Sequence, residues 1–314
     1  MSSNLPKMNI LFTSDQYTPA VNGVVTHIVF LREEMRKRGH NVYILTSKRP
    51  GSHPEKDVYY APSLYFFLRP MDTVAIPFTR GVMKELNALD INIIHNHFFM
   101  TGFMGMRLAK KKHIPLLATL HLTFQTYVDW LFPKGGKMLR PLGDSIAKSY
   151  LSTHDFVASP SLKGKKDLER IGVKPPVEVI HNGIILPTVE KVNGENFRKK
   201  YGLEAKTPFI VTSGRIDKGK NVDLAVEAFS KLHKKRPDVK LVIAGDGPLR
   251  GFVEKRASEL GVSNSVLFTG MLSKEEIYEV YKEASALLFA SDSDMLPTVI
   301  IEAFAFGVPA VSIR

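Results

Sequence analysis

The sequence predicts two α/β domains, each a doubly wound parallel sheet covered by helices, facing one another across a cleft. A chain of 314 residues is long for one hydrophobic core and comfortable for two. Short apolar runs alternate with amphipathic stretches from end to end, as in successive βαβ units. The rhythm stops in a polar stretch near residues 183–195, which we interpret as the linker between domains 1–185 and 186–314.

The first domain contains six apolar runs that are short enough to be buried strands. A helical pattern over residues 23–39 separates the first run from the second. The expected strands are MNILFT (8–13), NVYILT (41–46), INIIH (91–95), IPLLAT (114–119), DFVAS (155–159) and VEVIH (177–181).

The second domain repeats this alternation. The expected order is PFIVTSG (208–214), a helix from Asn221, VKLVIAG (239–245), a helix from Leu249, SVLFTG (265–270), a helix from Lys274, SALLFA (285–290), a helix around Val299 and PAVSI (309–313). In open parallel sheets ligands bind at the carboxyl ends of the strands, so binding residues are expected just after these runs.

The composition is that of a globular protein. Hydrophobic residues make up 44% of the chain and charged residues 24%, which excludes the compositions typical of disorder. The chain has no cysteine, which excludes disulfides and cysteine-ligated zinc. The N-terminal stretch lacks the pattern of a secretory signal, and no window approaches the ~20 apolar residues that cross a bilayer. We therefore expect a cytoplasmic protein.

Nearly all the excess positive charge lies in the first half. Residues 1–180 carry 24 Lys and Arg against 14 Asp and Glu, whereas residues 181–314 carry 19 against 17. A basic half suits an anionic membrane surface or nucleic acid, and a merely soluble basic surface is the alternative. No zinc finger, single-strand-binding aromatic pattern or helix-turn-helix spacing is recognisable, so we expect no nucleic-acid partner.

Two stretches that follow strands have the composition of anion sites. Asn22-Gly23 begins the first helix, where glycine admits a ligand close to the backbone amides; a purely geometric role for Gly23 is the alternative. Arg215 and Lys220 lie in GRIDKGKN (214–221), beside the start of the next helix. Two cations at a helix N-terminus suit a diphosphate, although a solvated basic turn has the same composition.

Asp294 and Glu302 bracket the start of a helix in SDSDMLPTVIIEAFAFGVPAVSI (291–313). Carboxylates in this arrangement can hold sugar hydroxyls by charge-assisted hydrogen bonds. The alternative is a helix-capping aspartate and a surface glutamate. Asp292 with Asp294 is a weak candidate for a metal pair, and we expect no metal site.

Residues 127–142 combine aromatic and basic side chains. Tyr127 and Trp130 are followed by Lys134, Lys137 and Arg140, and the stretch 106–113 adds four more cations. Aromatic residues beside lysines are typical of segments that bind at a membrane interface, and an ordinary helix with one buried face is the alternative.

Together these stretches resemble the retaining GT-B glycosyltransferases of family 4, whose two domains are Rossmann-like. The resemblance is carried by GRIDKGKN, GDGPLR (245–250), LFTG (267–270), residues 291–311, YTPAVNGVVTHI (17–28), RGHNVYILT (38–46), IIHNHF (93–98) and VIHNGI (179–184). TPAVNGVVTHI with TLHLTFQTY (119–127) is most similar to the bacterial diacylglycerol glucosyltransferases. Phosphatidylinositol mannosyltransferases and sulfolipid synthases share much of this pattern.

The resemblance implies a nucleotide-sugar donor and no required cofactor. We expect UDP-glucose, although the residues themselves do not distinguish UDP from GDP or glucose from galactose. Arg215 and Lys220 would neutralise the diphosphate, and Glu302 would hold the ribose. Asp294, where the family usually has glutamate, would bind the sugar hydroxyls of the donor. Fixed cations aimed at a departing diphosphate lower the barrier to its departure.

For the first domain the resemblance implies acceptor binding, and the composition of residues 127–142 is the reason to expect contact with the membrane there. His121 would stand beside the reacting carbon, and Gly23 would let the donor phosphates approach. From the residues alone, His121 is equally a core histidine bonded to backbone. Retention of configuration would bring the acceptor hydroxyl in on the face that the phosphate leaves, without a dedicated carboxylate base.

The implied reaction moves glucose from UDP-glucose to a membrane lipid such as 1,2-diacylglycerol, at the inner face of the cell membrane. Three alternatives remain open: transfer of mannose or glucose to phosphatidylinositol, transfer of either sugar to a soluble or polysaccharide acceptor, and a chain that binds without catalysing. Relatives continue beyond PAVSI through a glycine-rich loop, a strand and a helix, so we expect the C-terminal domain to be incomplete.

Overall fold

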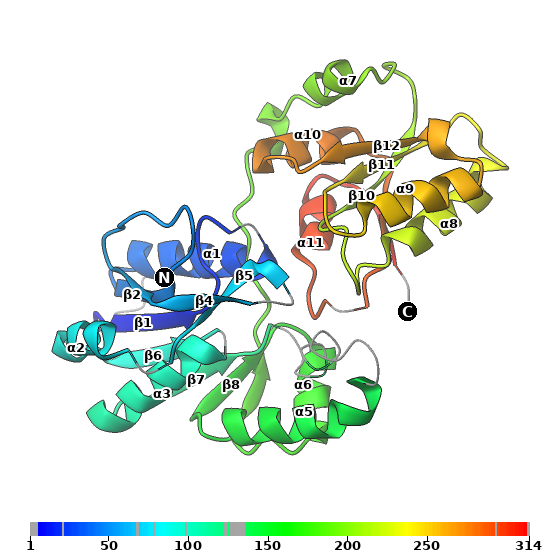
Figure 1. Cartoon of the computed structure of the whole chain (residues 1–314). Coiled ribbons are helices and arrows are strands. Elements are labelled where there is room, and N and C mark those ends of the chain that lie inside the picture. Colours follow the sequence, from blue (N-terminus) through cyan, green and yellow to red (C-terminus); the bar gives the residue numbers. More distant parts are fainter. Residues whose placement is uncertain are drawn as a thin grey trace. The chain divides into compact units, whose positions relative to one another are not determined.

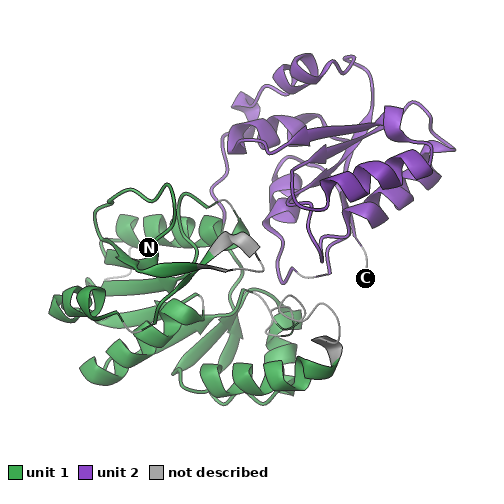
Figure 2. Cartoon of the chain, in the orientation of Figure 1, with its two compact units in different colours: residues 1–183 green, residues 184–314 purple. Residues whose placement is uncertain are grey.

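The computed structural model describes residues 6–20, 22–66, 69–77, 79–97, 99–121, 125, 128, 136–292 and 294–312. The chain divides into two compact units, unit 1 (Met1–Gly183) and unit 2 (Ile184–Arg314), which Figure 2 distinguishes by colour. Each unit has its own parallel sheet and its own hydrophobic core (Figure 1).

The sheet of unit 1 has seven parallel strands in the order β3-β2-β1-β6-β7-β8-β9. Its strand order reverses between β1 and β6, which are neighbours in the sheet, so their carboxyl ends form the switch point where ligands bind in such sheets. The strands are β1 (Asn9–Ser14), β2 (Asn41–Ser47), β3 (Val58–Ala61), β6 (Ile93–Asn96), β7 (Leu116–Thr119), β8 (Phe156–Ser159) and β9 (Val177–Val179).

Alternate residues of these strands pack against helices on opposite faces. Phe12 of β1 belongs to a cluster with Ile28 of α1, whereas Leu11 belongs to one with Leu86 of α2 and Met104 of α3. Period-two alternation places neighbouring side chains on opposite faces, so both faces are buried and the middle of a central strand is apolar, as in Ile10, Leu11 and Phe12 of β1. The helices are α1 (Gly23–Lys37), α2 (Arg80–Ala88), α3 (Met100–Lys112), α5 (Gly136–Leu151) and α6 (Leu162–Arg170).

Three strands of unit 1 were not expected from the sequence. β3 extends the sheet at its edge, and β4 (Ser63–Phe66) pairs antiparallel with β5 (Arg69–Ala75). The run of β3, VYYA, is only four residues long, and β5 includes Arg69, Pro70 and Asp72, so neither strand forms a long apolar run. The apolar-run criterion therefore missed them.

Unit 2 has five parallel strands in the order β12-β11-β10-β13-β14, with β10 at the switch point. The strands are β10 (Phe209–Ser213), β11 (Lys240–Ala244), β12 (Val266–Gly270), β13 (Ala286–Phe289) and β14 (Ala310–Ser312). The helices are α7 (Glu195–Tyr201), α8 (Val222–His233), α9 (Arg250–Glu259), α10 (Lys274–Glu283) and α11 (Thr298–Ala305), with 3₁₀ turns at Val189–Lys191 and Ser263–Ser265.

The predicted fold class, two doubly wound parallel α/β sheets, is confirmed. All eleven strands expected from apolar runs are present, and the four helices expected in the second half begin within one residue of the expected positions. Within the described part of the chain, no helix has both the length and the apolar character required to span a membrane.

Candidate functional site

The turn after β10 in unit 2 packs directly on the turn after β11. Gly214 has a φ of +126°, and its N–H donates to the Ala244 carbonyl at 3.0 Å. Ile216 N–H donates to the Asp246 carbonyl at 2.9 Å. A Cβ on Gly245 would lie 1.9 Å from the Gly214 oxygen, so the two turns approach more closely than any side chain permits. This contact fixes the path of residues 214–216.

The segment after β13 closes the other side of the same turn. Asn221 Nδ2 donates to the Ala290 carbonyl at 3.0 Å, and Asp292 N–H donates to the Gly219 carbonyl at 3.1 Å. Asn221 is the N-cap of α8 in a left-handed conformation, with a φ of 49°. The N-terminus of α8 is therefore held between the ends of β10 and β13.

Arg215 and Lys220 line one small pocket at the end of β10, together with Ser213, Gly214 and Ala290. Arg215 Nε lies 3.2 Å from an oxygen of Asp217, and Lys220 Nζ contacts both oxygens of Asp294 at 2.7 and 2.6 Å. Both cations are partly exposed. The structure thus brings three of the four predicted donor-binding side chains of this unit together.

The alternative interpretation of Asp294 as a helix cap is wrong, because the N-cap of α11 is Pro297.

Glu302 is buried in α11, not a surface glutamate, with 2% of its surface exposed. Burial raises the pKa of its carboxyl, and the neighbouring Lys274 ammonium, which forms an ion pair with it, acts in the opposite direction. From the sequence, Lys274 was predicted only as the first residue of a helix. Its partner is 28 positions away, so only the packing of α10 beside α11 brings the two charges together.

Unit 1 gathers histidines at the carboxyl end of its sheet. His97 follows β6, His121 follows β7, and His27 lies in the first half of α1. His97 Nδ1 is 3.1 Å from His121 Nε2. Burial lowers the pKa of His27 to about 4 and places those of His97 and His121 well below the usual 6.5, so all three rings are neutral at pH 7.

These three rings offer nitrogens within 4.8 Å of one another, close enough to hold a metal ion. The expectation that the chain needs no metal stays a prediction. The sequence analysis used His27 and His97 only as part of a family pattern, although their positions near strand ends were visible signals.

Asp15 also lies at the carboxyl end of this sheet, directly after β1, and was not predicted to have a role. Its carboxylate accepts hydrogen bonds from the N–H groups of Met100 and Thr101, at 2.9 and 3.1 Å, in the first turn of α3. A carboxylate at a helix N-terminus is stabilised by the unpaired amides and the helix dipole. Desolvation nevertheless raises its pKa to about 6, because the residue is 1% exposed.

Gly23 is the first residue of α1, as expected. The Asn22 side chain caps the helix by accepting from Val25 N–H at 3.0 Å, and its Nδ2 donates to Gln16 Oε1 at 2.6 Å. The helix N-terminus therefore lies beside the segment that follows β1.

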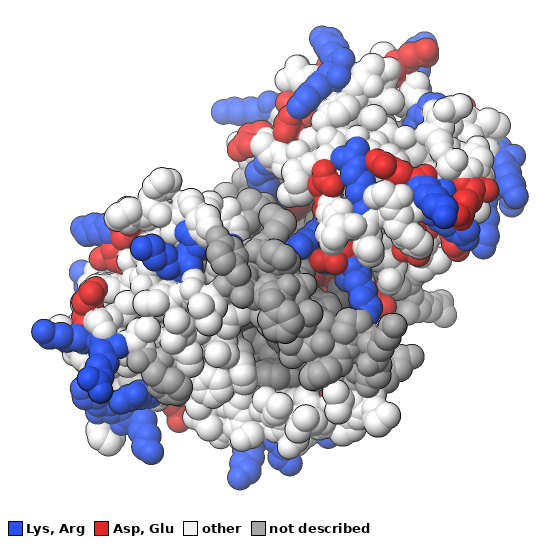
Figure 3. Space-filling model, in the orientation of Figure 1, with Lys and Arg blue, Asp and Glu red and all other residues white. Residues whose placement is uncertain are grey.

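Of the five predicted membrane-facing side chains, the structure describes that of Arg140. Tyr127, Trp130 and Lys134 lie outside the described residues, and only the backbone of Lys137 is described. Arg140 lies on α5, half-buried. The same helix exposes Met138, Leu142 and Ile146, which are four residues apart and therefore share one face. Basic side chains also gather over the α2 and α3 end of unit 1 (Figure 3).

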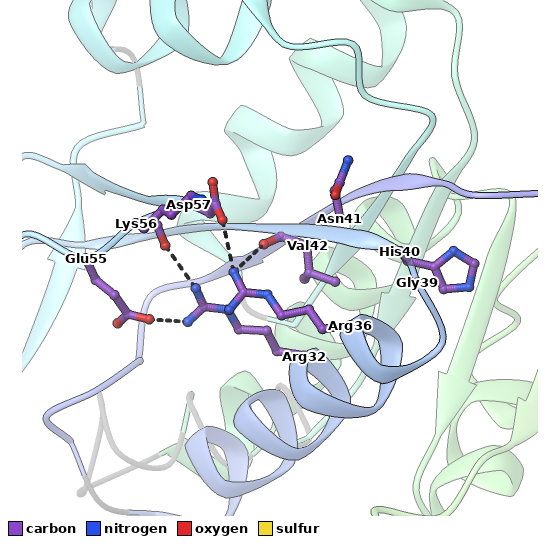
Figure 4. Close-up of a pocket in the computed structure, with 9 residues that line it drawn as sticks. All are labelled: Arg32, Arg36, Gly39, His40, Asn41, Val42, Glu55, Lys56 and Asp57. Carbon is purple, nitrogen blue, oxygen red and sulfur yellow. Dashed lines mark hydrogen bonds and ion pairs between the residues drawn. The ribbon is translucent and has the colours of Figure 1, made fainter.

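A larger pocket of unit 1 lies away from these residues, before β2 and β3 begin (Figure 4). Its two arginines already have partners, since Arg32 pairs with Glu55 and Arg36 with Asp57. Because it lies at the amino ends of the strands, it is separate from the candidate site.

Comparison with known proteins assigns both units. Residues 21–186 match the family described as Glycosyltransferase Family 4, and residues 193–314 match Glycosyl transferases group 1.

Two similar relatives are alpha-monoglucosyldiacylglycerol synthases. The one from Streptococcus pneumoniae is 31% identical over 97% of this chain and 71% of its own length. The one from Acholeplasma laidlawii is 26% identical over 97% of this chain and 80% of its own length. Among solved structures, HepE from Anabaena in complex with UDP and glucose superposes with a TM-score of 0.71, at 16% identity, over 97% of this chain and 80% of HepE. This likeness confirms the GT-B fold.

Proposed function

The chain belongs to glycosyltransferase family 4, and from this membership we propose that it transfers glucose from UDP-glucose to a membrane lipid, 1,2-diacylglycerol, with retention of configuration. The observation that carries the proposal is the 31% identity to alpha-monoglucosyldiacylglycerol synthase over 97% of this chain. No other feature points as specifically to one sugar and one class of acceptor.

The pocket at the end of β10 supports a diphosphate-bearing donor. Arg215 and Lys220 both line it, and the N-terminus of α8 begins at its edge. Negative charge grows on the diphosphate as its bond to the sugar breaks, and prearranged cations stabilise that charge. In the free protein Asp294 forms an ion pair with Lys220. When the donor binds, Lys220 would instead contact the diphosphate, and Asp294 would accept hydrogen bonds from the sugar hydroxyls.

Glu302 supports recognition of the ribose. Its ion pair with Lys274 favours the ionised carboxylate despite burial, and an ionised carboxylate accepts two hydrogen bonds from a pair of hydroxyls. In unit 1, His121 would lie beside the transferred sugar and Gly23 beside the donor phosphates. Unit 1 would bind the acceptor and unit 2 the nucleotide-sugar.

The acceptor half of the proposal is supported by the surface of α5. Exposed Met138, Leu142 and Ile146 share a face, with the cations Arg140 and Lys148 on the same helix. Such a face inserts into the headgroup region of an anionic membrane, where its cations attract acidic lipids. We propose that this binding places the protein on the inner face of the membrane.

The test is incubation of the purified chain with radiolabelled UDP-glucose and vesicles that contain diacylglycerol and an anionic lipid. The expected product is labelled α-glucosyldiacylglycerol, identified by chromatography and by its anomeric proton coupling. Labelled soluble sugar or polysaccharide without glycolipid would contradict the lipid acceptor. A β-linked product would contradict retention.

A further inference from the structure

The histidines of unit 1 make a directional contact that a hydrophobic core does not require. His97 Nδ1 and His121 Nε2 are 3.1 Å apart, and the ring of His27 packs against both, with centroids 5.6 and 5.2 Å away. Phe12 lies edge-on to His97, at 5.2 Å between centroids. The His97 ring is therefore held on several sides.

Two ring nitrogens at this distance must be one donor and one acceptor. A neutral imidazole carries its proton on one nitrogen and accepts on the other. Either His97 Nδ1–H donates to His121 Nε2, or His121 Nε2–H donates to His97 Nδ1. The two arrangements leave different tautomers of His121.

The other nitrogen of His97 decides between them. His97 Nε2 is buried and has no hydrogen-bond partner. If His97 accepted at Nδ1, its proton would be on Nε2, as a buried N–H without an acceptor. Orphaned buried N–H groups are rarer than under-satisfied acceptors. The favoured arrangement therefore has the His97 proton on Nδ1, donated to His121 Nε2.

We propose that His97 is a positioning residue that fixes His121 in the Nδ1–H tautomer, so that His121 presents a hydrogen-bond donor to the sugar. His121 is the more accessible of the two rings, 9% exposed against 2% for His97. A donor at this position suits a sugar hydroxyl oxygen. The inference rests on the proposed function, in which His121 lies beside the transferred sugar.

The tautomer is tested without any assay of activity, by ¹⁵N NMR of the full chain labelled at histidine, with His121→Gln used for assignment. The wild type is expected to show His121 protonated at Nδ1, with Nε2 as the acceptor. His97→Leu, which removes the donor, is expected to give a mixture of tautomers. His97→Asn, which places an amide donor near the former Nδ1, should keep the wild-type pattern.

Two spectra would overturn the proposal: a wild-type His121 protonated at Nε2, or a His97→Leu variant with an unchanged tautomer. A third is a spectrum in which the ring nitrogens lack protons until EDTA is added, because these rings lie close enough for a metal.

Kinetics test the positioning role. We expect His97→Leu to lower kcat about 10- to 100-fold, the range seen when partners that orient metal-bound histidines are removed, with the KM for UDP-glucose little changed. His97→Asn should recover most of the activity. In a His121→Ala background, His97→Leu should have no further effect.

An equal loss in the His121→Ala background would overturn the proposal, because His97 would then act through the fold. The two failures are distinguishable. If the wild type transfers no glucose to lipid, the proposed function fails, whereas the NMR result still decides the tautomer of His121.

Discussion

At the residue scale, several buried histidines and one buried aspartate lie at or near the carboxyl end of the unit 1 sheet. Burial lowers the pKa of His27 to about 4 and of His95 to about 3, and it lowers those of His97 and His121 well below 6.5. These rings stay neutral in the folded protein at pH values where the unfolded chain takes up protons. Their contribution to stability is complete above pH 6.5 and is lost as the pH falls below it.

We therefore expect the free energy of unfolding to fall between pH 6.5 and pH 4.5, by up to about 1.4 kcal/mol per pH unit for each histidine that stays neutral. Asp15 acts in the opposite direction. Burial raises the pKa of Asp15 from 3.8 to about 6. Its contribution to the free energy of unfolding is therefore complete below pH 3.8 and is lost as the pH rises through 6. Urea unfolding at a series of pH values measures the net effect of the histidines and Asp15 on the free energy of unfolding.

Asp15→Asn is the matched control for that series, because it removes the opposing titration and should steepen the loss of stability on acidification. A free energy of unfolding that stays constant or increases from pH 6.5 to pH 4.5 would contradict the burial of these neutral histidines.

At the scale of elements, the close contact between the turns after β10 and β11 sets the position of the cations. Gly245→Ala would place a methyl group 1.9 Å from the Gly214 oxygen, which is backbone and cannot rotate away. We expect this variant to lose about 2 kcal/mol or more of stability, and to lose donor affinity because residues 214–216 must move.

Gly251→Ala is the control, since a Cβ at Gly251 in α9 meets nothing within 4 Å. Alanine is the better helix former, so this variant should be as stable as the wild type or up to ~1 kcal/mol more stable. Urea unfolding and calorimetric titration with UDP compare the two. Equal behaviour of both variants would refute the role assigned to the contact.

A separate prediction concerns membrane binding by the exposed apolar face of α5. Leu142→Ser with Ile146→Ser should weaken binding to anionic vesicles in a sedimentation assay, because about 25 cal/mol of apolar transfer energy is lost per Å². Phe252→Ser on α9 of unit 2, also exposed, should leave binding unchanged. If both substitutions weaken binding equally, the face of α5 is not the membrane contact.

At the scale of the whole molecule, the elements predicted best from sequence are those decided by local patterns. The central strands were predicted because burial on both faces demands apolar runs, as in Leu11 and Phe12. The positions of Gly23, Arg215 and Lys220 were predictable because they lie in the segments that join such runs to the next helix. The short run of β3 and the polar residues of β5 gave no such signal.

The rest of the site depends on contacts between distant positions. The ion pair between Lys274 and Glu302 joins α10 to α11. The hydrogen bonds of Asp15 join the end of β1 to α3. Glycine is needed at position 245 only because Gly214 packs against it. No local pattern encodes such partners. His27, His97 and His121 likewise come from α1 and from two different strand ends. The expected cleft between the domains stays a prediction.

The central claim is that Arg215 and Lys220 stabilise the departing diphosphate. The most direct test is the turnover of an Arg215→Met, Lys220→Met variant, beside Lys218→Met, which removes the exposed third cation of the same turn. We expect the double variant to keep its fold by circular dichroism and to lose at least ~100-fold in kcat, since each preorganised group contributes about that much. Lys218→Met should stay near wild type. A folded double variant with wild-type turnover would contradict the account.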